Sequence, residues 1–581
     1  MPESLPPSPR AVRLIGRGMS GPLGPLLGPL ARSLFDDIPY PEDAAARIRE
    51  LSRDGVIVYV HRSRNAVDYL ALSRVCRRMQ LPEARYVGGL HVALWQPWWR
   101  LLGRRRGVRG APEEAARRDE WLLQETVRSG YAAELFLRRP LTLVTTRAEY
   151  RARFVEALIR LQREFDRPIY LVPHLLALRQ RTANLEPTAA DVVFGTGEEP
   201  GALRAVGRLA LSRRHARWEV SEPIDLLRFV QEREEQSDAV LAKKVRWTLL
   251  NHLARSERAV HGPATKSHAR MAEDTLKDPA LREEIAAIAD RDHEVATDLE
   301  RRARKLYDEI AARFDIDVVR ALDPLLRLVW HRIYDGIEID SAGIERIRRA
   351  AREGPLVIVP SHRSHVDYLV MNQALFWHGL MPPLIAAGAN LSFFPLGPIL
   401  RRGGAYFLRR SFKGDRLYAA VFRAYVKRLF KEGYTQYFFI EGGRSRTGKT
   451  LPPKMGILTM LVDAFLESRQ PDAMFVPTNI SYERIIEADS YTRELHGAEK
   501  QQENAGALLR SASVLRSKYG RVFVRIDEPL SLATFMRERG FDPAAHTTEE
   551  KRHFISTLAY RICYGINRAQ VVTATSLVVT A

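Results

Sequence analysis

An internal repeat is the feature that most constrains the fold of this chain. Residues 54–70 read DGVIVYVHRSRNAVDYL and residues 353–369 read EGPLVIVPSHRSHVDYL, so both contain a short apolar run, His-Arg-Ser and Val-Asp-Tyr-Leu. Three further pairs of segments match in the same order. LFLRRP at 135–140 matches YFLRRS at 406–411, IYLVP at 169–173 followed by RQRT at 179–182 matches YFFIEGGRSRT at 437–447, and WEVSEPIDL at 218–226 matches FVRIDEPLSL at 523–532. Four matches in one order predict two related domains.

Both repeats alternate between predicted strands and predicted helices. The runs PLVIV at 355–359 and YFFI at 437–440 are continuously apolar, as is typical of buried strands. Residues 366–376 and 415–432 have helical periodicity, and Gly433 stands where a helix commonly ends. Strands that alternate with helices predict an α/β fold, with a largely parallel sheet covered on both faces.

The repeat also predicts how the chain is divided. We expect a mobile N-terminal extension over 1–40, a first α/β domain over 41–235, a helical connector over 236–340, a second α/β domain over 341–540 and a C-terminal helical segment over 541–581. The connector shows one apolar helix face, because apolar residues recur there at spacings of three and four. These residues are Val295, Leu299, Ala303, Leu306, Ile310 and Phe314.

Composition narrows the class of protein. Hydrophobic residues make up 45% of the 581 residues, enough for a large core. Lys and Arg exceed Asp and Glu by 90 to 70, and the net charge of +20 favours an anionic partner: a nucleic acid, an acidic membrane surface or a phosphorylated substrate. The two cysteines are too few for a disulfide framework or a Cys-rich metal site. No apolar stretch reaches the roughly 18 residues of a spanning helix, so we expect a peripheral or soluble cytoplasmic protein.

The segment His362-Arg-Ser-His365-Val-Asp367 is the first candidate for catalysis. It follows a predicted strand, and ligands in open α/β sheets bind beyond the carboxyl ends of strands. Asp367 can orient the imidazole of His362, which then removes a proton from an attacking alcohol. His365 is a rival for the base, and both histidines have an ordinary reading as turn residues. A metal site is disfavoured because no second ligand cluster lies nearby in sequence.

The loop Glu441-Gly-Gly-Arg444-Ser445-Arg446-Thr-Gly-Lys449 is a candidate phosphate site. Gly442 and Gly443 let the backbone approach a ligand, and the two arginines can fork onto phosphate oxygens. A solvated basic loop is the alternative. The same stretch matches the P-loop pattern, but Pro452 and Pro453 follow it where a P-loop must open into a helix. We therefore do not expect a nucleotide hydrolase.

Four blocks together resemble the glycerolipid acyltransferase superfamily, whose signature is His, four residues, then Asp. The blocks are VPSHRSHVDYL at 359–369, GAYFLRRSFKGDRLY at 404–418, FFIEGGRSRTGK at 438–449 and VPTNISYE at 476–483. The sequence of these four blocks is similar to that of the bacterial glycerol-3-phosphate acyltransferase branch of the superfamily. The resemblance implies two related acyltransferase-like α/β domains, the first degenerate and the second catalytic.

The resemblance also implies roles for individual residues. His362 is the general base on the sn-1 hydroxyl and Asp367 is its partner. The residues implied in binding glycerol 3-phosphate are Arg410, Arg444 and Arg446, with Glu441, Gly442 and Ser445 of the third block and Pro477 of the fourth. Arg409 and Lys454 are weaker helpers. In the first domain the pattern is broken, because six residues separate His61 from Asp68 and because Pro173 and His174 stand where Glu441 and its glycines would fall.

The implied reaction transfers a fatty acyl group from acyl-CoA or acyl-carrier protein to glycerol 3-phosphate, giving lysophosphatidate. It requires neither a metal nor a bound cofactor. We expect no nucleic-acid partner but an anionic membrane surface, at the cytoplasmic face of the inner membrane. Two alternatives stay open: an acyltransferase for dihydroxyacetone phosphate, and a non-catalytic basic membrane-binding protein. Family members usually continue beyond the point where this chain stops.

Two stretches mix apolar and basic residues, as membrane interfaces do. Residues 95–109 interleave tryptophans and leucines with arginines. Residues 391–402, LSFFPLGPILRR, lie near the predicted active blocks. The second stretch has three readings: an acyl-chain wall, a membrane edge, or a core loop.

Overall fold

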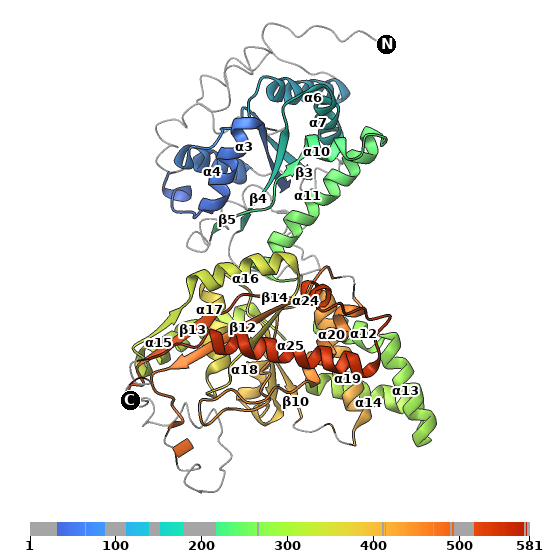
Figure 1. Ribbon diagram of the computed structural model, residues 1–581, viewed down its shortest axis with the longest axis vertical. Coiled ribbons are helices and arrows are strands. Elements are labelled where there is room, and N and C mark those ends of the chain that lie inside the picture. The colour runs from blue at the N-terminus through green and yellow to red at the C-terminus, as the bar shows by residue number, and fades with distance from the viewer. Residues whose placement is uncertain are drawn as a thin grey trace. The chain divides into compact units, whose positions relative to one another are not determined.

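A computed structural model places most of the chain, in two compact units over 1–257 and 258–581. It describes residues 32–63, 66–87, 112–138, 152–177, 216–263, 266–409, 412, 414–468, 470–488, 491–492, 516–573 and 577. Both units are α/β (Figure 1). Of the expected mobile extension over 1–40, residues 1–31 lie outside the described residues, as does the tryptophan-rich stretch at 95–109. The prediction is wrong for the rest of the extension, because Phe35, Ile38 and Tyr40 are buried in the core of the first unit.

The second unit is built on an eight-stranded sheet in the order β10-β9-β11-β8-β12-β13-β7, with β14 paired to β12. Its strands are β7 (Gly336–Ile339), β8 (Leu356–Pro360), β9 (Leu384–Gly388), β10 (Ala405–Leu408), β11 (Gln436–Tyr437), β12 (Met474–Tyr482), β13 (Arg521–Ile526) and β14 (Leu530–Ser531). From β10 to β12 all neighbours are parallel, whereas β13 and β14 run antiparallel to β12. The carboxyl ends of β9, β11, β8 and β12 therefore meet at one edge.

Helices cover both faces of this sheet. One face carries Val357, Val359 and Phe475 and packs against α12 (His268–Leu276), α13 (Pro279–Asp292), α14 (Ala296–Ile310), α19 (Arg416–Glu432), α20 (Gly456–Leu466), α24 (Leu532–Glu538) and α25 (Thr548–Arg568). The other carries Leu356, Ile358 and Val476 and packs against α15 (Ile316–Ile333), α16 (Ser341–Glu353) and α17 (Asp367–Trp377). Alternate residues of one strand thus pack into two different hydrophobic cores, which explains why these strands are continuously apolar in sequence.

The first unit repeats this plan with a six-stranded sheet in the order β2-β3-β1-β4-β5, with β6 paired to β4. Its strands are β1 (Val56–Ser63), β2 (Tyr86–Val87), β3 (Ala133–Arg138), β4 (Ile169–Ala177), β5 (Arg217–Val220) and β6 (Ile224–Asp225). Its helices are α3 (Glu42–Asp54), α4 (Ala66–Met79), α6 (Pro112–Arg128), α7 (Ala152–Glu164), α10 (Leu226–Gln231) and α11 (Asp238–His261), the last of which crosses the unit boundary.

Strand order matches the two units element by element. The order β2-β3-β1-β4-β5 corresponds to β9-β11-β8-β12-β13, and in both units the last pair is antiparallel. In both, a short strand that pairs back onto the long central strand is followed directly by a helix, α10 or α24. The described part of the fold therefore supports two related α/β domains.

Two of the four predicted segment matches are wrong. β3 is hydrogen-bonded directly to β1, as β11 is to β8, whereas β10 lies at the far edge of its sheet. β3 thus corresponds to β11 and β4 to β12, so Pro173 corresponds to Pro477 and not to the neighbourhood of Glu441. The register agrees, since Pro173 pairs with Val60 and Pro477 with Val359. Short apolar strings are too similar for sequence to choose among parallel strands.

Local sequence patterns correctly predicted the positions of helices α19 and α14. α19 begins after Asp415, whose side chain accepts a hydrogen bond from Tyr418 N, and it ends at Gly433 with φ of +83°. The apolar stripe of the expected connector lies on α14, where Leu299, Ala303 and Ile310 are buried. The connector as a whole is not a separate body, because the two units divide at 257/258 and residues 258–340 belong to the second.

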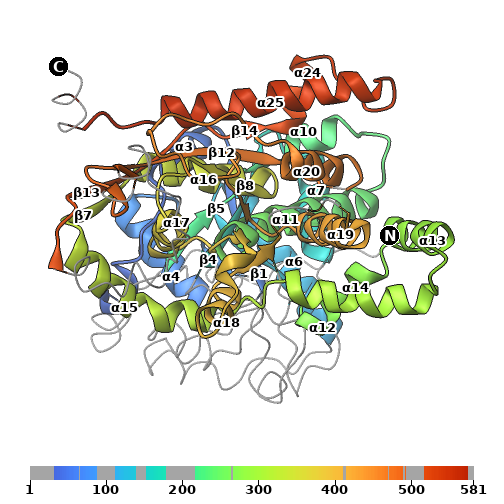
Figure 2. The same cartoon turned by 90° about the horizontal axis from the view of Figure 1, so that it is seen from below.

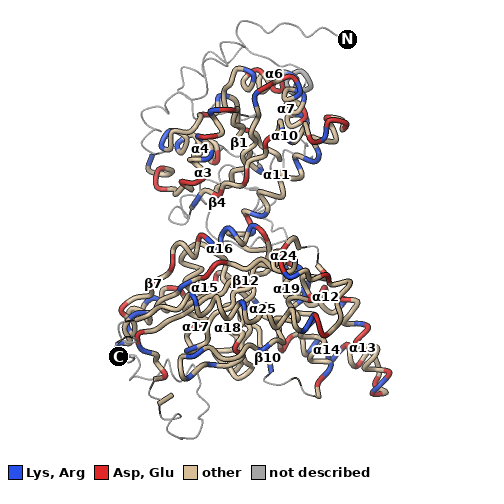
Figure 3. Tube along the Cα trace, viewed as in Figure 1, with Lys and Arg blue, Asp and Glu red and all other residues tan. Residues whose placement is uncertain are grey.

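No helix among the described residues combines the length and the apolarity needed to cross a bilayer. Basic and acidic residues alternate along the described parts of both units (Figure 3).

Candidate active site

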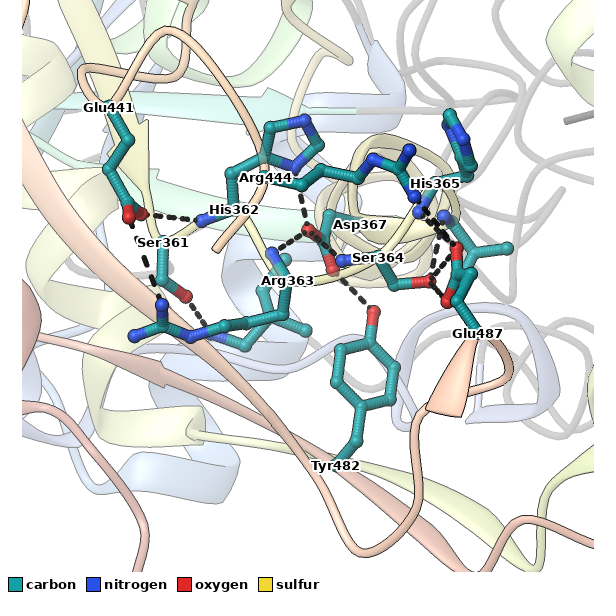
Figure 4. A network of polar contacts seen from close by, with 12 residues as sticks. Ser361, His362, Arg363, Ser364, His365, Asp367, Glu441, Arg444, Tyr482 and Glu487 are labelled. Atoms are coloured by element: carbon teal, nitrogen blue, oxygen red, sulfur yellow. Dashed lines mark hydrogen bonds and ion pairs between the residues drawn. The ribbon is translucent and has the colours of Figure 1, made fainter. Parts of the chain in front are cut away.

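The turn after β8 brings His362 and Asp367 together. The imidazole Nδ1 lies 3.0 Å from Asp367 Oδ2, and the Asp367 side chain is fully buried (Figure 4). Residues 361–366 are not helical, and Asp367 opens α17, so the turn closes a gap that a continuous helix would leave. With Nδ1–H donating to the carboxylate, Nε2 is the nitrogen that accepts a proton.

Asp367 is fixed from several sides. Its Oδ2 also accepts hydrogen bonds from Arg363 N at 2.7 Å and Ser364 N at 2.9 Å, and its Oδ1 accepts one from Tyr482 Oη at 2.6 Å. Tyr482 is the last residue of β12, the strand beside β8. Burial, with Asp367 as the next cause, raises the pKa of Tyr482 well above its usual range, so the phenol stays a donor.

The His362 ring is held but remains reachable. It stacks on Phe439 with ring centroids 3.6 Å apart and an interplanar angle of 11°. Its side chain is 16% exposed. An oriented imidazole at a sheet edge, with a buried carboxylate behind it, suits general base catalysis on a hydroxyl group.

Glu441 ties the two candidate loops together. Its fully buried carboxylate accepts hydrogen bonds from His362 N at 2.9 Å and Leu451 N at 2.8 Å, and lies 3.8 Å from the Arg363 guanidinium. In return, Ser445 N donates to His362 O at 2.9 Å. Glu441 is therefore a brace between the loop after β8 and the loop after β11.

The arginines of the third block turn inward. Arg444 Nη1 donates to Tyr491 Oη at 2.7 Å and lies 3.8 Å from Glu487 Oε1, and its side chain is 15% exposed. The Arg446 guanidinium lies 5.9 Å from the centre of the Tyr491 ring, and that of Arg444 lies 5.5 Å from it. Both cations thus gather beside the His362 turn, as a phosphate site requires.

Other predicted residues are placed differently. Arg410 lies outside the described residues. Arg409 forms ion pairs with Glu309 and Asp415, which ties the end of β10 to the connector helix α14 and to the start of α19. Pro477 is buried inside β12, where a Cβ added at Gly565 of α25 would lie 2.8 Å from its ring. We place Pro477 in the core behind the turn.

Sequence reasoning missed Glu487. Its buried carboxylate accepts hydrogen bonds from Ser364 Oγ at 2.9 Å and His365 N at 2.8 Å, besides facing Arg444 (Figure 4). Burial raises the pKa of Glu487, partly offset by those donors. Tyr482 belongs to the fourth sequence block, so the sequence offered a reason to place it near the site. Glu487 follows that block and belongs to no motif that would have indicated it.

Two rival readings, His365 as the base and a P-loop, fit the structure less well. Asp367 faces the ring of His362, while His365 is engaged through its backbone N–H by Glu487. The P-loop pattern does not open into a helix, because α20 begins only at Gly456. Across the ranges that the structure describes, no group of three His, Cys, Asp or Glu side chains could hold a metal ion.

The first unit has lost this geometry. His61 lies within β1, paired in register with Phe136 of β3, and is buried to 1% exposure. Its Nε2 lies 3.2 Å from Glu134, also inside the sheet. Since Val60 pairs with Pro173 as Val359 pairs with Pro477, His61 corresponds to Pro360, two residues before His362, and so falls within the strand instead of the turn.

Two family models match parts of the second unit. Residues 338–481 match the Acyltransferase family model, and residues 491–581 match the glycerol-3-phosphate acyltransferase C-terminal region. Curated relatives include the glycerol-3-phosphate acyltransferases of Pasteurella multocida (strain Pm70), 37% identical over 354 residues, and of Haemophilus influenzae (strain PittEE), 38% identical over 353. Each alignment covers 60% of this chain and 43% of the relative, so the matched part spans less than half the length of those proteins.

Among solved structures, the 1-acyl-sn-glycerophosphate acyltransferase PlsC from Thermotoga maritima matches 41% of this chain and 73% of its own, with 17% identity and a TM-score of 0.22. The second unit of this chain thus contains a region that matches the Acyltransferase family, and the chain is similar in sequence to bacterial glycerol-3-phosphate acyltransferases.

Proposed function

We propose that this chain is a glycerol-3-phosphate acyltransferase, which transfers a fatty acyl group to the sn-1 hydroxyl and yields lysophosphatidate. The observation that carries the proposal is the His362–Asp367 pair beside the inward-turned Arg444 and Arg446. A base and a cationic cluster at one sheet edge fit a substrate that has both a hydroxyl and a phosphate. The curated relatives named above support the same acceptor.

The reaction needs one proton transfer and one displacement. His362 Nε2 takes the proton of the acceptor hydroxyl as its oxygen forms a bond to the thioester carbonyl carbon. The carbon–sulfur bond then breaks, and the leaving thiolate takes the proton back from the imidazolium. Asp367 stabilises the imidazolium in between. The donor in this proposal is acyl-CoA or acyl-carrier protein.

The arginines contribute by position. A phosphate held by Arg444 and Arg446, with Arg410 as a further candidate, places the hydroxyl near Nε2. Such positioning contributes about 7–11 kcal/mol where the geometry is right. Glu441, Gly442 and Ser445 shape the loop that presents these arginines. No metal or cofactor enters any of these steps.

We further propose that the enzyme works at the cytoplasmic face of the inner membrane as a peripheral protein. The net charge of +20 supports an anionic surface as its partner. A product with one acyl chain and one phosphate also belongs at such a surface.

The decisive experiment follows labelled glycerol 3-phosphate into lysophosphatidate with an acyl-CoA donor. His362→Ala should lower kcat/KM at least about 100-fold, which is the usual contribution of a general base. His365→Ala is the matched control and should retain activity, because its ring does not face Asp367. Circular dichroism verifies that both variants fold.

The same assay includes dihydroxyacetone phosphate as a competing acceptor. Faster acylation of dihydroxyacetone phosphate would show that it, and not glycerol 3-phosphate, is the preferred acceptor. Salt-sensitive vesicle binding without any acyl transfer would favour a non-catalytic membrane-binding protein. Normal activity in His362→Ala would remove the base assignment.

A further inference from the structure

The two oxygens of the Asp367 carboxylate face different parts of the second unit. Oδ2 lies on the side of the turn after β8, where it accepts hydrogen bonds from Arg363 N and Ser364 N besides facing His362 Nδ1. Oδ1 accepts one hydrogen bond, from Tyr482 Oη at 2.6 Å, and no other described residue donates to it. The phenol is therefore the contact that ties this carboxylate to a second strand, β12.

Tyr482 is held by a paired strand. β12 pairs with β8 as far as Thr478, which lies opposite Pro360 at the end of β8. The strand then continues to Tyr482, which pairs with Val522 of β13. A donor on a paired strand is placed more precisely than a donor on a loop, so the sheet itself sets the position of the phenol.

The pleat of β12 determines the direction of the phenol, because successive side chains of a strand point to opposite faces. Ile480 and Tyr482 pack into the core that contains residues of α17, whereas Asn479 donates from Nδ2 to Ile566 O of α25 at 3.1 Å. α17 and α25 lie on opposite sides of β12 (Figure 2). Tyr482 is therefore directed toward the first turn of α17, which begins at Asp367.

Other charged or titratable groups surround the pair formed by His362 and Asp367. They come from the turn itself, from β11 and the loop after it, from the segment after β12 and from the end of α15: Arg363, Tyr437, Glu441, Arg444, Glu487 and Tyr334. Burial, with the charge of Asp367 as a further cause, raises the pKa of Tyr334 and that of Tyr437 well above the usual range. Neither hydroxyl makes a hydrogen bond to a residue that the structure describes, so Tyr482 is the one phenol of the three that is bonded to the carboxylate.

We propose that Tyr482 is a positioning residue, which fixes the second oxygen of Asp367 and lowers the affinity of the His362–Asp367 pair for a proton. A donor bound to an ionised carboxylate stabilises the ionised form and disperses its charge. The carboxylate then attracts the imidazolium less strongly, so the pair stays unprotonated, and able to accept the substrate proton, down to lower pH. This inference rests on the proposed function, in which the pair acts as the base.

The variant Tyr482→Phe tests the proposal, because it removes one oxygen atom and keeps the ring. In the pH profile of kcat/KM for glycerol 3-phosphate, the acid limb should move to higher pH by at least about half a unit, part of what one hydrogen bond to a charged group contributes. The substrate phosphate also titrates near about pH 6, but equally for both proteins. At the optimum, kcat should fall about three- to tenfold because the imidazole is oriented less firmly, while KM should stay within about twofold.

Tyr334→Phe is the matched control. The rings of Tyr334 and Tyr482 have centroids 6.1 Å apart, and the hydroxyl of Tyr334 is buried but bonds to none of the described residues. This variant removes a phenol from the same surroundings without taking a donor from Asp367, so its pH profile should match that of the wild type. Circular dichroism verifies that both variants fold. An acid limb that does not move in Tyr482→Phe, or that moves equally in both variants, would overturn the proposal.

A measurement without substrate separates this inference from the proposed reaction. In full-length protein labelled with carbon-13 at histidine Cε1, the NMR signal of His362 is identified by its loss in His362→Ala. That signal should titrate at higher pH in Tyr482→Phe than in the wild type or in Tyr334→Phe. If the titration moves while no protein transfers acyl groups, the proposed reaction is wrong and the role of Tyr482 stands. If acyl transfer is observed but the titration is the same in all three proteins, the role of Tyr482 is wrong and the reaction stands.

Discussion

At the scale of single residues, the site depends on carboxylates that are buried yet fully engaged. Asp367 accepts two backbone N–H groups and a phenol besides the imidazole of His362. A buried charge without such partners would cost several kcal/mol. Here the same contacts that offset burial also fix the direction in which the carboxylate faces His362, so stability and orientation have one cause.

Glu487 provides the prediction at this scale. Glu487→Gln keeps an oxygen for His365 N but removes the negative charge that faces Arg444 at 3.8 Å. We expect Arg444 to be held less firmly, so that KM for glycerol 3-phosphate rises about tenfold while kcat changes less. Steady-state kinetics with glycerol 3-phosphate as the varied substrate measures both constants.

Glu483→Gln is the control for that measurement, since Glu483 accepts a hydrogen bond from Arg521 N and makes no described contact with the arginine loop. Its KM should match the wild type. A fall in kcat alone in Glu487→Gln would show that Glu487 acts on the His362 turn instead of on Arg444.

At the scale of elements, the loop after β11 depends on one backbone conformation. Gly442 has φ of +65°, and a Cβ there would lie 2.7 Å from Lys454 Cγ. Gly442→Ala should therefore cost about 1–2 kcal/mol from the left-handed conformation alone, and Lys454 must also move. Thermal unfolding should show a lower Tm, and acyl transfer should fall because Arg444 is displaced.

Gly443 is the natural comparison. It has no positive φ, and a Cβ there would meet no atom within 4 Å. Gly443→Ala should leave Tm within about a degree of the wild type. Equal losses of Tm in the two variants would contradict the conformational explanation.

At the scale of the whole molecule, the two units use one topology for different chemistry. His174 of β4 corresponds to Thr478 of β12, because they follow the equivalent prolines Pro173 and Pro477. His174 is buried, with Nδ1 3.0 Å from Val172 O and Nε2 2.8 Å from Tyr40 Oη. Burial, with a smaller effect of His61, lowers the pKa of His174 from 6.5 to about 3.

This shift makes the first unit sensitive to acid. Between pH 6.5 and about 3 the unfolded chain binds a proton that the folded chain excludes, so stability falls as pH is lowered. The slope for one proton is about 1.4 kcal/mol per pH unit. Hydrogen exchange of β4 amides in the full chain, corrected for intrinsic rates, should show protection that declines from pH 6.5 to 5.

The substitution His174→Thr removes the titrating imidazole and introduces threonine, the residue found at the equivalent position, Thr478, of the second unit. Its β4 protection should depend less on pH than that of the wild type, whatever its value at pH 6.5. Identical slopes in the two proteins would show that other groups cause the acid sensitivity. Burial lowers the pKa of His61, but Glu134 more than offsets this, so that the pKa is raised in the folded protein. The effect of His61 on stability is therefore opposite to that of His174, because its contribution to stability is lost as pH rises.

Sequence predicted what depends on local pattern. The turn that joins His362 to Asp367 and the end of α19 at Gly433 both follow from a few adjacent residues. The contacts of Glu487 and the correspondence of β3 to β11 did not, because they depend on which distant segments the fold brings together. The roles implied for all of the site residues stay predictions, as do the acyl donor, the membrane surface, the localisation and the absence of a cofactor.

The brace formed by Glu441 has a consequence for how mutational data at this site are read. One carboxylate holds the amide of the histidine and the amide of Leu451, on two loops. Loosening it would shift the proposed proton acceptor, His362, and the proposed anion anchor, Arg444, in a single movement. A defect in turnover and a defect in affinity would then appear together, and neither could be assigned to chemistry or to recognition from kinetics alone.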